Sequence, residues 1–285
     1  MWASISVAGL LLVFSFPGTM GFILLFFGIA VASLFWCPAQ TATPRGRMTS
    51  LGTDPHSVWI PATPAPTSHA TSRTELIHIA VAYIVLTVDL AIILSGRGFF
   101  EGGTLTGLLA PVPYLFILLA MAAGLTGFLA HEIAHKLAAR RLGYWAEFRL
   151  WPVGLLLSVL TSVAGFLFAA PGATVVDAMD SNDVRDWGKT AVAGPISNLL
   201  FAAGFYGASV VTFATNQVTS EALLFLAMIN TLFATFNLLP IGPLDGAKVF
   251  RWDIGRWVAV FVVAAAALAV TYTAFYADRT PFLSW

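Results

Sequence analysis

The chain has 285 residues, of which 58% are hydrophobic and only 10% are charged, whereas a soluble domain carries about 25% charged residues. This composition, with a mean hydropathy of +0.84, is typical of a protein that crosses a membrane several times. The 14 basic and 14 acidic residues cancel, so the charge gives no indication of a nucleic-acid partner. The single cysteine, Cys37, excludes an internal disulfide and a cysteine-based zinc site.

The first 75 residues divide into an apolar part and a polar part. Residues 3–36 are almost continuously apolar, broken by Phe16-Pro17-Gly18-Thr19, and this run is too long for one membrane span of about 20 residues. We therefore predict a transmembrane hairpin over 1–36 that turns at the Pro-Gly step. A signal peptide is the alternative, but the run lacks a basic start and Met20–Trp36 has no small-residue cleavage pattern. Residues 37–75 are rich in Pro, Thr and Ser, which predicts a linker.

Five more apolar segments follow the linker, and each is long enough to cross a bilayer. They are Leu76–Ser95, Pro111–Arg141, Ala191–Thr212, Glu221–Leu239 and Trp257–Phe275. The first contains Asp89, whose charge is costly inside a membrane, so this side chain must face protein or water. A contact with an active-site cavity and a hydrogen bond to a neighbouring helix both meet that requirement. With the hairpin, these segments predict about seven transmembrane helices.

The region between the second and third of these segments interrupts the helical pattern. Leu142–Leu150 alternates apolar and polar side chains, which predicts a β-strand. Residues 151–170 are apolar again, but we expect them to enter and leave on the same side of the membrane, before a polar loop from Pro171 to Lys189. With that arrangement 12 of the 14 Lys and Arg residues lie on one side, which is typical of the cytosolic side.

The fold class expected from these patterns is an all-α polytopic membrane protein. It has about seven transmembrane helices, a small membrane-associated β element and a re-entrant hydrophobic segment.

The segment His131-Glu132-Ile-Ala-His135 places a metal-hydrolase motif inside an apolar helix. Positions four apart lie on one face of a helix, so His131 and His135 can present imidazole nitrogens to a single ion beside Glu132. Two histidines leave a tetrahedral Zn²⁺ in need of a third protein ligand, and the open fourth position of such a site holds a water molecule. Glu132 is then the expected general base.

The segment from Asn237 to Gly246 is the expected second half of the site. Pro240 and Pro243 remove backbone donors at the end of a membrane helix, so the helix must unwind there. Irregular backbone at membrane depth is tolerated where it lines a cavity or is buried in protein, which predicts a polar interior site. Asp245 is the natural third zinc ligand, and Asn237 could donate its amide to a developing oxyanion.

A third short element, Gly194-Pro195-Ile-Ser-Asn198, lies near the start of the span over 191–212. Its small residues permit close approach of helices, and Asn198 can hydrogen-bond across the bundle. Pure packing explains this element equally well from the sequence alone.

The three motifs together resemble those of the site-2 protease family of intramembrane zinc metalloproteases, over about residues 112–250. The matching elements are His131-Glu132-x-x-His135, Gly194-Pro195-x-x-Asn198 and Asn237-x-x-Pro240-x-x-x-Leu244-Asp245-Gly246.

The resemblance implies that one Zn²⁺ is bound by His131, His135 and Asp245. It implies that Glu132 activates water and that Asn237 helps to hold the scissile peptide. Members of this family cut membrane-spanning segments of other proteins. The strand at 142–150 is similar in placement to the family's substrate-pairing β element, which adds an extended peptide by backbone hydrogen bonds.

The domain organisation expected is a hairpin at 1–36, a linker at 37–75, a metalloprotease core at 76–250 and a C-terminal transmembrane helix with its tail at 251–285. We expect an integral multi-pass protein of a prokaryotic cell membrane, with its active site toward the cytosol. Its partners are then the bilayer and membrane-spanning protein substrates, without nucleic acid, and a homo-oligomer stays open.

The expected function is that of a zinc-dependent intramembrane endopeptidase, and two alternatives compete with it. In a polytopic metal transporter, His131, His135 and Asp245 would form a transit site, and further ligands would follow along a path. In a catalytically silent relative, the same fold would bind membrane helices without cutting them, although the intact Glu132 argues against this.

Overall fold

The computed structural model describes residues 10–12, 71–97, 104–169, 171–177, 183–242 and 244–277. Most of the predicted hairpin and linker therefore lies outside the described residues. Within the hairpin, Leu10–Leu12 form a short strand, β1, where the sequence predicts helix.

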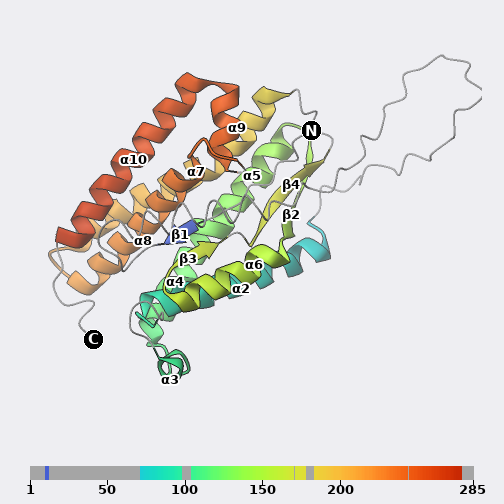
Figure 1. Cartoon of the computed structure of the whole chain (residues 1–285). Helices are drawn as coiled ribbons and strands as arrows, with labels where there is room; N and C mark the ends of the chain where they lie inside the picture. Colours follow the sequence, from blue (N-terminus) through green and yellow to red (C-terminus); the bar gives the residue numbers. More distant parts are fainter. Residues whose placement is uncertain are drawn as a thin grey trace, which may run out of the picture.

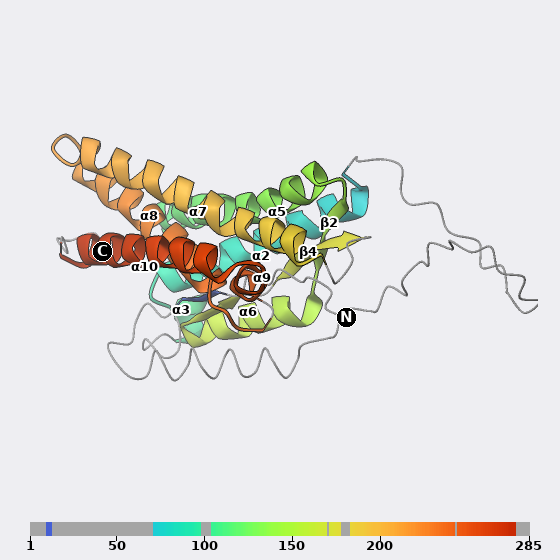
Figure 2. The ribbon, with the colours of Figure 1, turned by 90° about the horizontal axis from the view of Figure 1, so that it is seen from above.

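Five helices are long and apolar enough to cross a membrane, and they coincide with the five apolar segments predicted after the linker. Their bounds are α2 (Arg73–Leu94), α4 continuing into α5 (Tyr114–Arg141), α7 (Val184–Thr212), α8 (Gln217–Asn237) and α10 (Ile254–Ala277). Figures 1 and 2 show the long helices lying side by side, with a small sheet at one end of the bundle. Two further short helices are α3 (Leu105–Leu108) and α9 (Asp245–Trp252).

The predicted motif helix contains a local change of winding. It consists of α4 (Tyr114–Ala123), a π-helical turn η2 (Gly124–Leu129) and α5 (Ala130–Arg141). A π-turn widens the helix and alters the hydrogen bonding of its carbonyls. The side chain of Asn198 on α7 donates to the Gly127 carbonyl in this turn at 2.9 Å. The turn therefore lies directly before His131 and is joined to α7.

The sheet consists of β2 (Trp145–Leu150) and β4 (Gly172–Asp177), which pair antiparallel from Trp145↔Asp177 to Leu150↔Gly172. The strand predicted over 142–150 is thus confirmed as β2. The prediction of a polar loop from Pro171 to Lys189 is wrong at 172–177, which form the second strand, and at 184–189, which belong to α7. The backbone groups of 172–177 form hydrogen bonds with β2. The side-chain pattern of 172–177 alone does not predict this pairing.

The apolar segment 151–170 forms the helix α6 (Pro152–Ala164) and the strand β3 (Leu167–Ala169), which pairs with β1. A helix of 13 residues is about 20 Å long, shorter than the roughly 30 Å hydrocarbon core of a bilayer. Gly165 ends the helix with a φ of 110°, a left-handed conformation that favours glycine. The Trp151 N–H donates to the Pro171 carbonyl at 2.8 Å, so the two ends of the segment meet beside the sheet.

The apolar core connects the motif helix to the sheet and to α8. Phe128 of η2 packs edge to face against Phe148 of β2, with ring centroids 5.6 Å apart. The buried Glu75 at the start of α2 accepts from the Phe148 N–H at 3.0 Å and pairs with Lys136 of α5. These contacts fix β2 against both helices.

Asp89 lies away from the metal-ligating residues. Ser162 of α6 donates to its carboxylate at 2.8 Å, and the carboxylate is buried between the two helices. Of the two roles open from the sequence, the structure shows the hydrogen bond to a neighbouring helix.

Candidate metal centre

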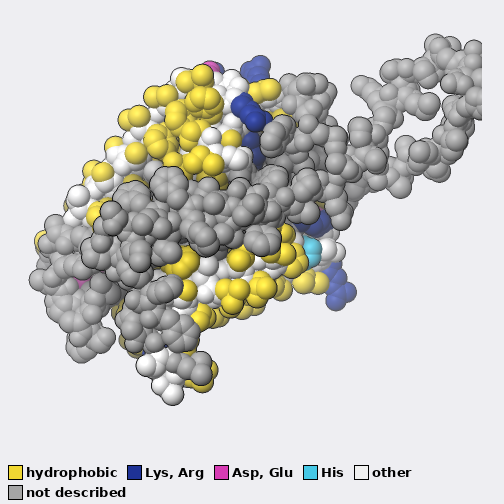
Figure 3. Space-filling view, viewed as in Figure 1, with side chains coloured by type: hydrophobic (Ala, Val, Ile, Leu, Met, Phe, Trp, Pro, Cys, Tyr) yellow, Lys and Arg dark blue, Asp and Glu magenta, His cyan; other side chains and the backbone are white. Residues whose placement is uncertain are grey.

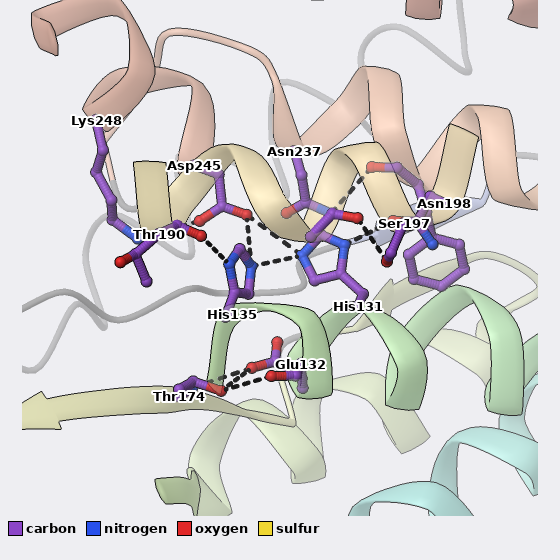
Figure 4. Close-up of polar contacts among 12 residues, drawn as sticks. His131, Glu132, His135, Thr174, Thr190, Ser197, Asn198, Asn237, Asp245 and Lys248 are labelled. Carbon is purple, nitrogen blue, oxygen red and sulfur yellow. Dashed lines mark hydrogen bonds and ion pairs between the residues drawn. The ribbon is translucent and has the colours of Figure 1, made fainter. Parts of the chain in front are cut away.

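The three predicted metal ligands converge. His131 and His135 extend from α5, and Asp245 is the first residue of α9, as Figure 4 shows. Their Nε2 atoms lie 3.0 Å apart, and Oδ2 of Asp245 lies 3.3 Å from His131 Nε2 and 3.0 Å from His135 Nε2. All three side chains are buried, and their ligand atoms lie within 4.8 Å of one another.

The geometry of Asp245 depends on the break in the chain after α8. The helix ends at Asn237, two residues before the predicted end at Leu239, and α9 begins eight residues later. The indole N–H of Trp257 donates to the Leu238 carbonyl at 2.8 Å and so satisfies one of the carbonyls left at the helix end. The chain can therefore turn back and place Asp245 beside α5.

The second ring nitrogen of each histidine has a partner on α7. His131 Nδ1 lies 2.6 Å from Oδ1 of Asn198, whose amide nitrogen faces the Gly127 carbonyl, and His135 Nδ1 lies 2.7 Å from the Thr190 carbonyl. A backbone carbonyl can only accept, so the His135 Nδ1 carries a proton and a neutral ring offers its Nε2 lone pair to the centre. The sequence alone allowed either a cross-bundle hydrogen bond or pure packing for Asn198. The structure shows the hydrogen bond.

Asp245 has a cation on its other side. Lys248, one turn along α9, donates to Oδ1 at 3.1 Å, which leaves Oδ2 toward the histidines. Burial alone would raise the pKa of Asp245, but the neighbouring His135 and Lys248 hold it well below its usual range. The ion pair with Lys248 favours the carboxylate form of Asp245.

These residues fit a catalytic zinc ion. Two imidazole nitrogens and one carboxylate oxygen are a donor set found in zinc hydrolases, and three ligands leave a position open. Separations of 3.0 to 3.3 Å are close to the roughly 3.3 Å edge of a tetrahedron with metal–ligand distances of about 2.0 to 2.1 Å.

Gly194 of α7 lies directly against the two imidazole rings. A Cβ at this position would lie 2.5 Å from Nε2 of His135 and 2.6 Å from Nε2 of His131. Such distances are far shorter than ordinary van der Waals contacts. The absence of a side chain at 194 thus allows α7 to approach the ligands closely enough for its own residues to orient both rings.

Glu132 faces the sheet rather than the cluster of ligands. Its Oε2 accepts from the Thr174 backbone N–H at 3.0 Å and from the Thr174 hydroxyl at 2.8 Å. Its Oε1 is buried and has no hydrogen-bond partner among the described residues. Figure 4 shows Glu132 on the side of α5 toward β4, with the histidines pointing to Asp245.

Asn237 is buried beside the ligands at the end of α8. Its amide nitrogen donates to the Phe233 carbonyl within its own helix at 3.0 Å. One amide hydrogen and the side-chain oxygen remain for a further partner, since the oxygen has none in the described part of the chain.

A pocket opens beside the ligands between β4, α7 and α9. Its lining residues are His135, Thr174, Val176, Trp187, Thr190, Ala191, Asp245 and Lys248. Trp187, Val176 and Ala191 line the apolar part of the pocket, and the predicted ligands His135 and Asp245 also line it. It is large enough to admit only a small group beside them.

Three contributors were missed from the sequence. Thr174 lies in a segment that was predicted to be a loop. Thr190 acts through its backbone carbonyl, for which no side-chain pattern exists. Lys248 carried a usable signal, because residues three apart on a helix are neighbours and it follows Asp245 at that spacing.

The family resemblance implies substrate pairing by the strand at 142–150, but outward N–H groups of β2 already have acceptors in the structure. The outward N–H of Phe148 is bonded to Glu75, and that of Leu150 lies 3.3 Å from Nδ1 of His78. The sheet has two strands, so β4 pairs with no other strand on its second edge within the described chain. The edge nearer to Glu132 therefore belongs to β4.

Comparison with known proteins agrees with the chemistry of the site. The family described as "Peptidase family M50" matches residues 208–275, a region that contains Asn237 and Asp245. A protein of Methanocaldococcus jannaschii named "Putative zinc metalloprotease MJ0611" is 38% identical over 147 residues, which cover 51% of this chain and 75% of that protein.

A second relative is more distant. The protein named "Putative zinc metalloprotease Rip3" of Mycobacterium tuberculosis is 33% identical over 157 residues, which cover 54% of this chain and 35% of the relative. No solved structure matches the chain.

Proposed function

The chain belongs to peptidase family M50, the site-2 protease family of zinc metalloproteases, and from this premise we propose that it is an intramembrane endopeptidase. Its substrates would be membrane-spanning segments of other proteins. The observation that carries the proposal is the convergence of three buried ligand atoms, within 4.8 Å of one another, between helices long and apolar enough to span a bilayer. The same three residues, His131, His135 and Asp245, would hold one Zn²⁺.

Zinc bound at these residues would supply Lewis-acid activation of a water molecule and of the scissile carbonyl. Side chains of the protein would supply proton transfer and hydrogen bonding to the peptide. Glu132 would accept the proton of the attacking water and return it to the leaving amine. Its unpartnered Oε1 is the oxygen available for this transfer. Asn237 would donate its free amide hydrogen to the carbonyl oxygen of the peptide.

The substrate would lie along the outer edge of β4. Hydrolysis in the middle of a helix is hindered because its peptide groups are bonded within the helix, so the segment must unwind before it is cut. An unwound segment can satisfy its backbone groups by adding as a strand to an open edge. The pocket that contains Thr174 and Val176 next to His135 supports this position.

The active site would open toward the cytosol. Ten of the 11 described Lys and Arg residues lie at the end of the bundle that bears the ligands, where the positive-inside rule expects the cytosol. We also propose that 151–170 is re-entrant, supported by the short α6 and by the hydrogen bond between Trp151 and Pro171. The metalloprotease core would span 76–250, and the N-terminal hairpin would contact it through the pairing of β1 with β3.

A metal transporter is not favoured. Transit needs a series of sites along a path, whereas only one group of three potential ligands occurs among the described residues.

The proposal is tested with Glu132→Gln, which removes the base and keeps all three ligands. Tagged single-span proteins are expressed together with the wild type or with the variant. We expect a zinc-dependent fragment only with the wild type, and equal zinc content in both purified proteins. Fragments of equal yield from both would remove Glu132 from the reaction.

The role of the ligands is measured separately. Purified Asp245→Ala and His131→Ala proteins should contain little zinc, because each loses one of three ligands. Full zinc content in the Asp245→Ala protein would make Asp245 a bystander.

A further inference from the structure

We propose that Thr174 is a positioning residue for Glu132, holding one carboxylate oxygen so that the other is available to accept a proton. The inference rests on the proposed function, in which Glu132 is the general base. It assigns a role to β4, the strand that the sequence pattern did not reveal.

The contact between the two residues is extensive. Thr174 donates to Oε2 of Glu132 twice, from its backbone N–H at 3.0 Å and from its hydroxyl at 2.8 Å. The hydroxyl also lies 3.2 Å from the backbone carbonyl of Glu132. Thr174 is 3% exposed and Glu132 is 2% exposed, so water does not replace these donors.

The two oxygens of the Glu132 carboxylate therefore have different roles. Glutamate has three rotatable side-chain bonds, and an unrestrained carboxylate would spread over several rotamers. Two donors on Oε2 fix one orientation. Oε1 is the atom left without a partner among the described residues. Proton transfer in the proposed reaction then falls to Oε1.

The strand delivers both donors because of its register. Thr174 lies opposite Phe148, and the N–H of each points away from the other strand, to Glu132 and to Glu75 respectively. Such a pair is a non-hydrogen-bonded pair of an antiparallel ladder. The Thr174 N–H is thus free of the ladder and can serve the motif helix, while the contact between Phe128 and Phe148 holds the sheet against that helix.

The role can be separated from packing with two substitutions. Thr174→Val keeps the branched shape and the backbone N–H but removes the hydroxyl, and its neighbours Val175 and Val176 show that valine suits this strand. Thr174→Ser keeps the hydroxyl and removes only a methyl group. The readouts are kcat, KM and zinc content of the purified full-length protein with a cleavable single-span substrate.

For Thr174→Val we expect kcat to fall about 10- to 100-fold, the usual effect of losing a partner that orients a group at a metal site. KM and zinc content should stay at wild-type levels. Thr174→Ser should restore most of kcat. A normal kcat in Thr174→Val, or an equal loss of kcat in both variants, would overturn the inference, as would loss of zinc.

Glu132→Gln separates this inference from the proposed function. If that variant is inactive while Thr174→Val is fully active, Glu132 stays the base and only the role of Thr174 fails. If Glu132→Gln cleaves normally, the proposed function fails at its base, and Thr174 has nothing to position.

Discussion

At the scale of single residues, the close approach of α7 decides how the ligands are held. Asn198 and the Thr190 carbonyl fix the two imidazole rings from one side, while Gly194 leaves room for those rings between them. Residues outside the ligand set thus determine which ring nitrogen is free. If a side chain at position 194 held α7 farther from α5, Asn198 and Thr190 could not form these hydrogen bonds with the two rings.

Gly194→Ala should therefore impair the metal site. Its Cβ would lie 2.5 to 2.6 Å from ring atoms of both histidines, and a backbone-fixed methyl group cannot rotate away. We expect zinc affinity to fall by at least about tenfold, as for other disturbances of ligand orientation. Titration of the metal-free protein with zinc measures the change.

The matched control is Gly204→Ala on the same helix. An added Cβ there meets no atom within 4 Å, and alanine is the better helix former. Zinc affinity should equal that of the wild type. Equal affinity in both variants would show that α7 can move away without cost.

At the scale of elements, the position of β4 places an open sheet edge beside the site. The Thr174 N–H points outward to Glu132, and backbone direction alternates along a strand, so the Val176 N–H points to the same side. Val175 lies between them and faces β2. The Thr174 N–H is already bonded to Glu132, so the Val176 N–H is the outward donor beside the site that an added strand could use.

Val176→Pro tests whether the substrate uses this edge. Proline removes an outward N–H and leaves the ladder with β2 intact, so one hydrogen bond to the substrate is lost. One such bond contributes about 0.5 to 1.5 kcal/mol, so KM should rise about 2- to 12-fold with zinc content unchanged.

Two controls accompany this variant. Val176→Ala reports the loss of the side chain, which lines the pocket, and keeps the N–H. Val175→Pro removes a ladder donor and should destabilise the sheet itself. If Val176→Pro and Val176→Ala have the same KM, the outer edge of β4 does not bind the substrate.

The elements differ in how far the sequence could predict them. Long apolar runs gave the five spans, and alternation gave β2, because both signals are contained in the segment itself. The ligands followed from fixed spacing on α5 and from the break after Asn237. By contrast, β4 is a strand because of β2, and β3 pairs with Leu10–Leu12 far away in the sequence. Such long-range pairing leaves no local pattern.

At the scale of the whole molecule, charge and site lie at the same end of the bundle. Of the 11 described Lys and Arg residues, ten lie at the starts of α2, α7 and α10, at the end of α5, or on β2 and α9. Figure 3 shows several of them gathered at that end, beside a largely apolar surface over the helices. Arg97, after the end of α2, is at the other end and binds the carbonyls of Ala110 and Pro111. By the positive-inside rule, this distribution supports the proposed orientation, with the site toward the cytosol.

The path of residues 151–170 determines that orientation for every later helix. If the segment returns to its own side, Thr74 at the start of α2 and Val184 at the start of α7 lie on one side of the membrane, and Thr215 between α7 and α8 lies on the other. If the segment crosses, Val184 changes sides and Thr215 joins Thr74. All three positions are exposed.

A single cysteine at each, in a Cys37→Ser background, can be labelled in sealed vesicles with an impermeant maleimide. We expect Thr74→Cys and Val184→Cys to label together and Thr215→Cys to be protected under the same conditions. Joint labelling of Thr74→Cys and Thr215→Cys would instead establish a crossing at 151–170 and overturn the proposed topology.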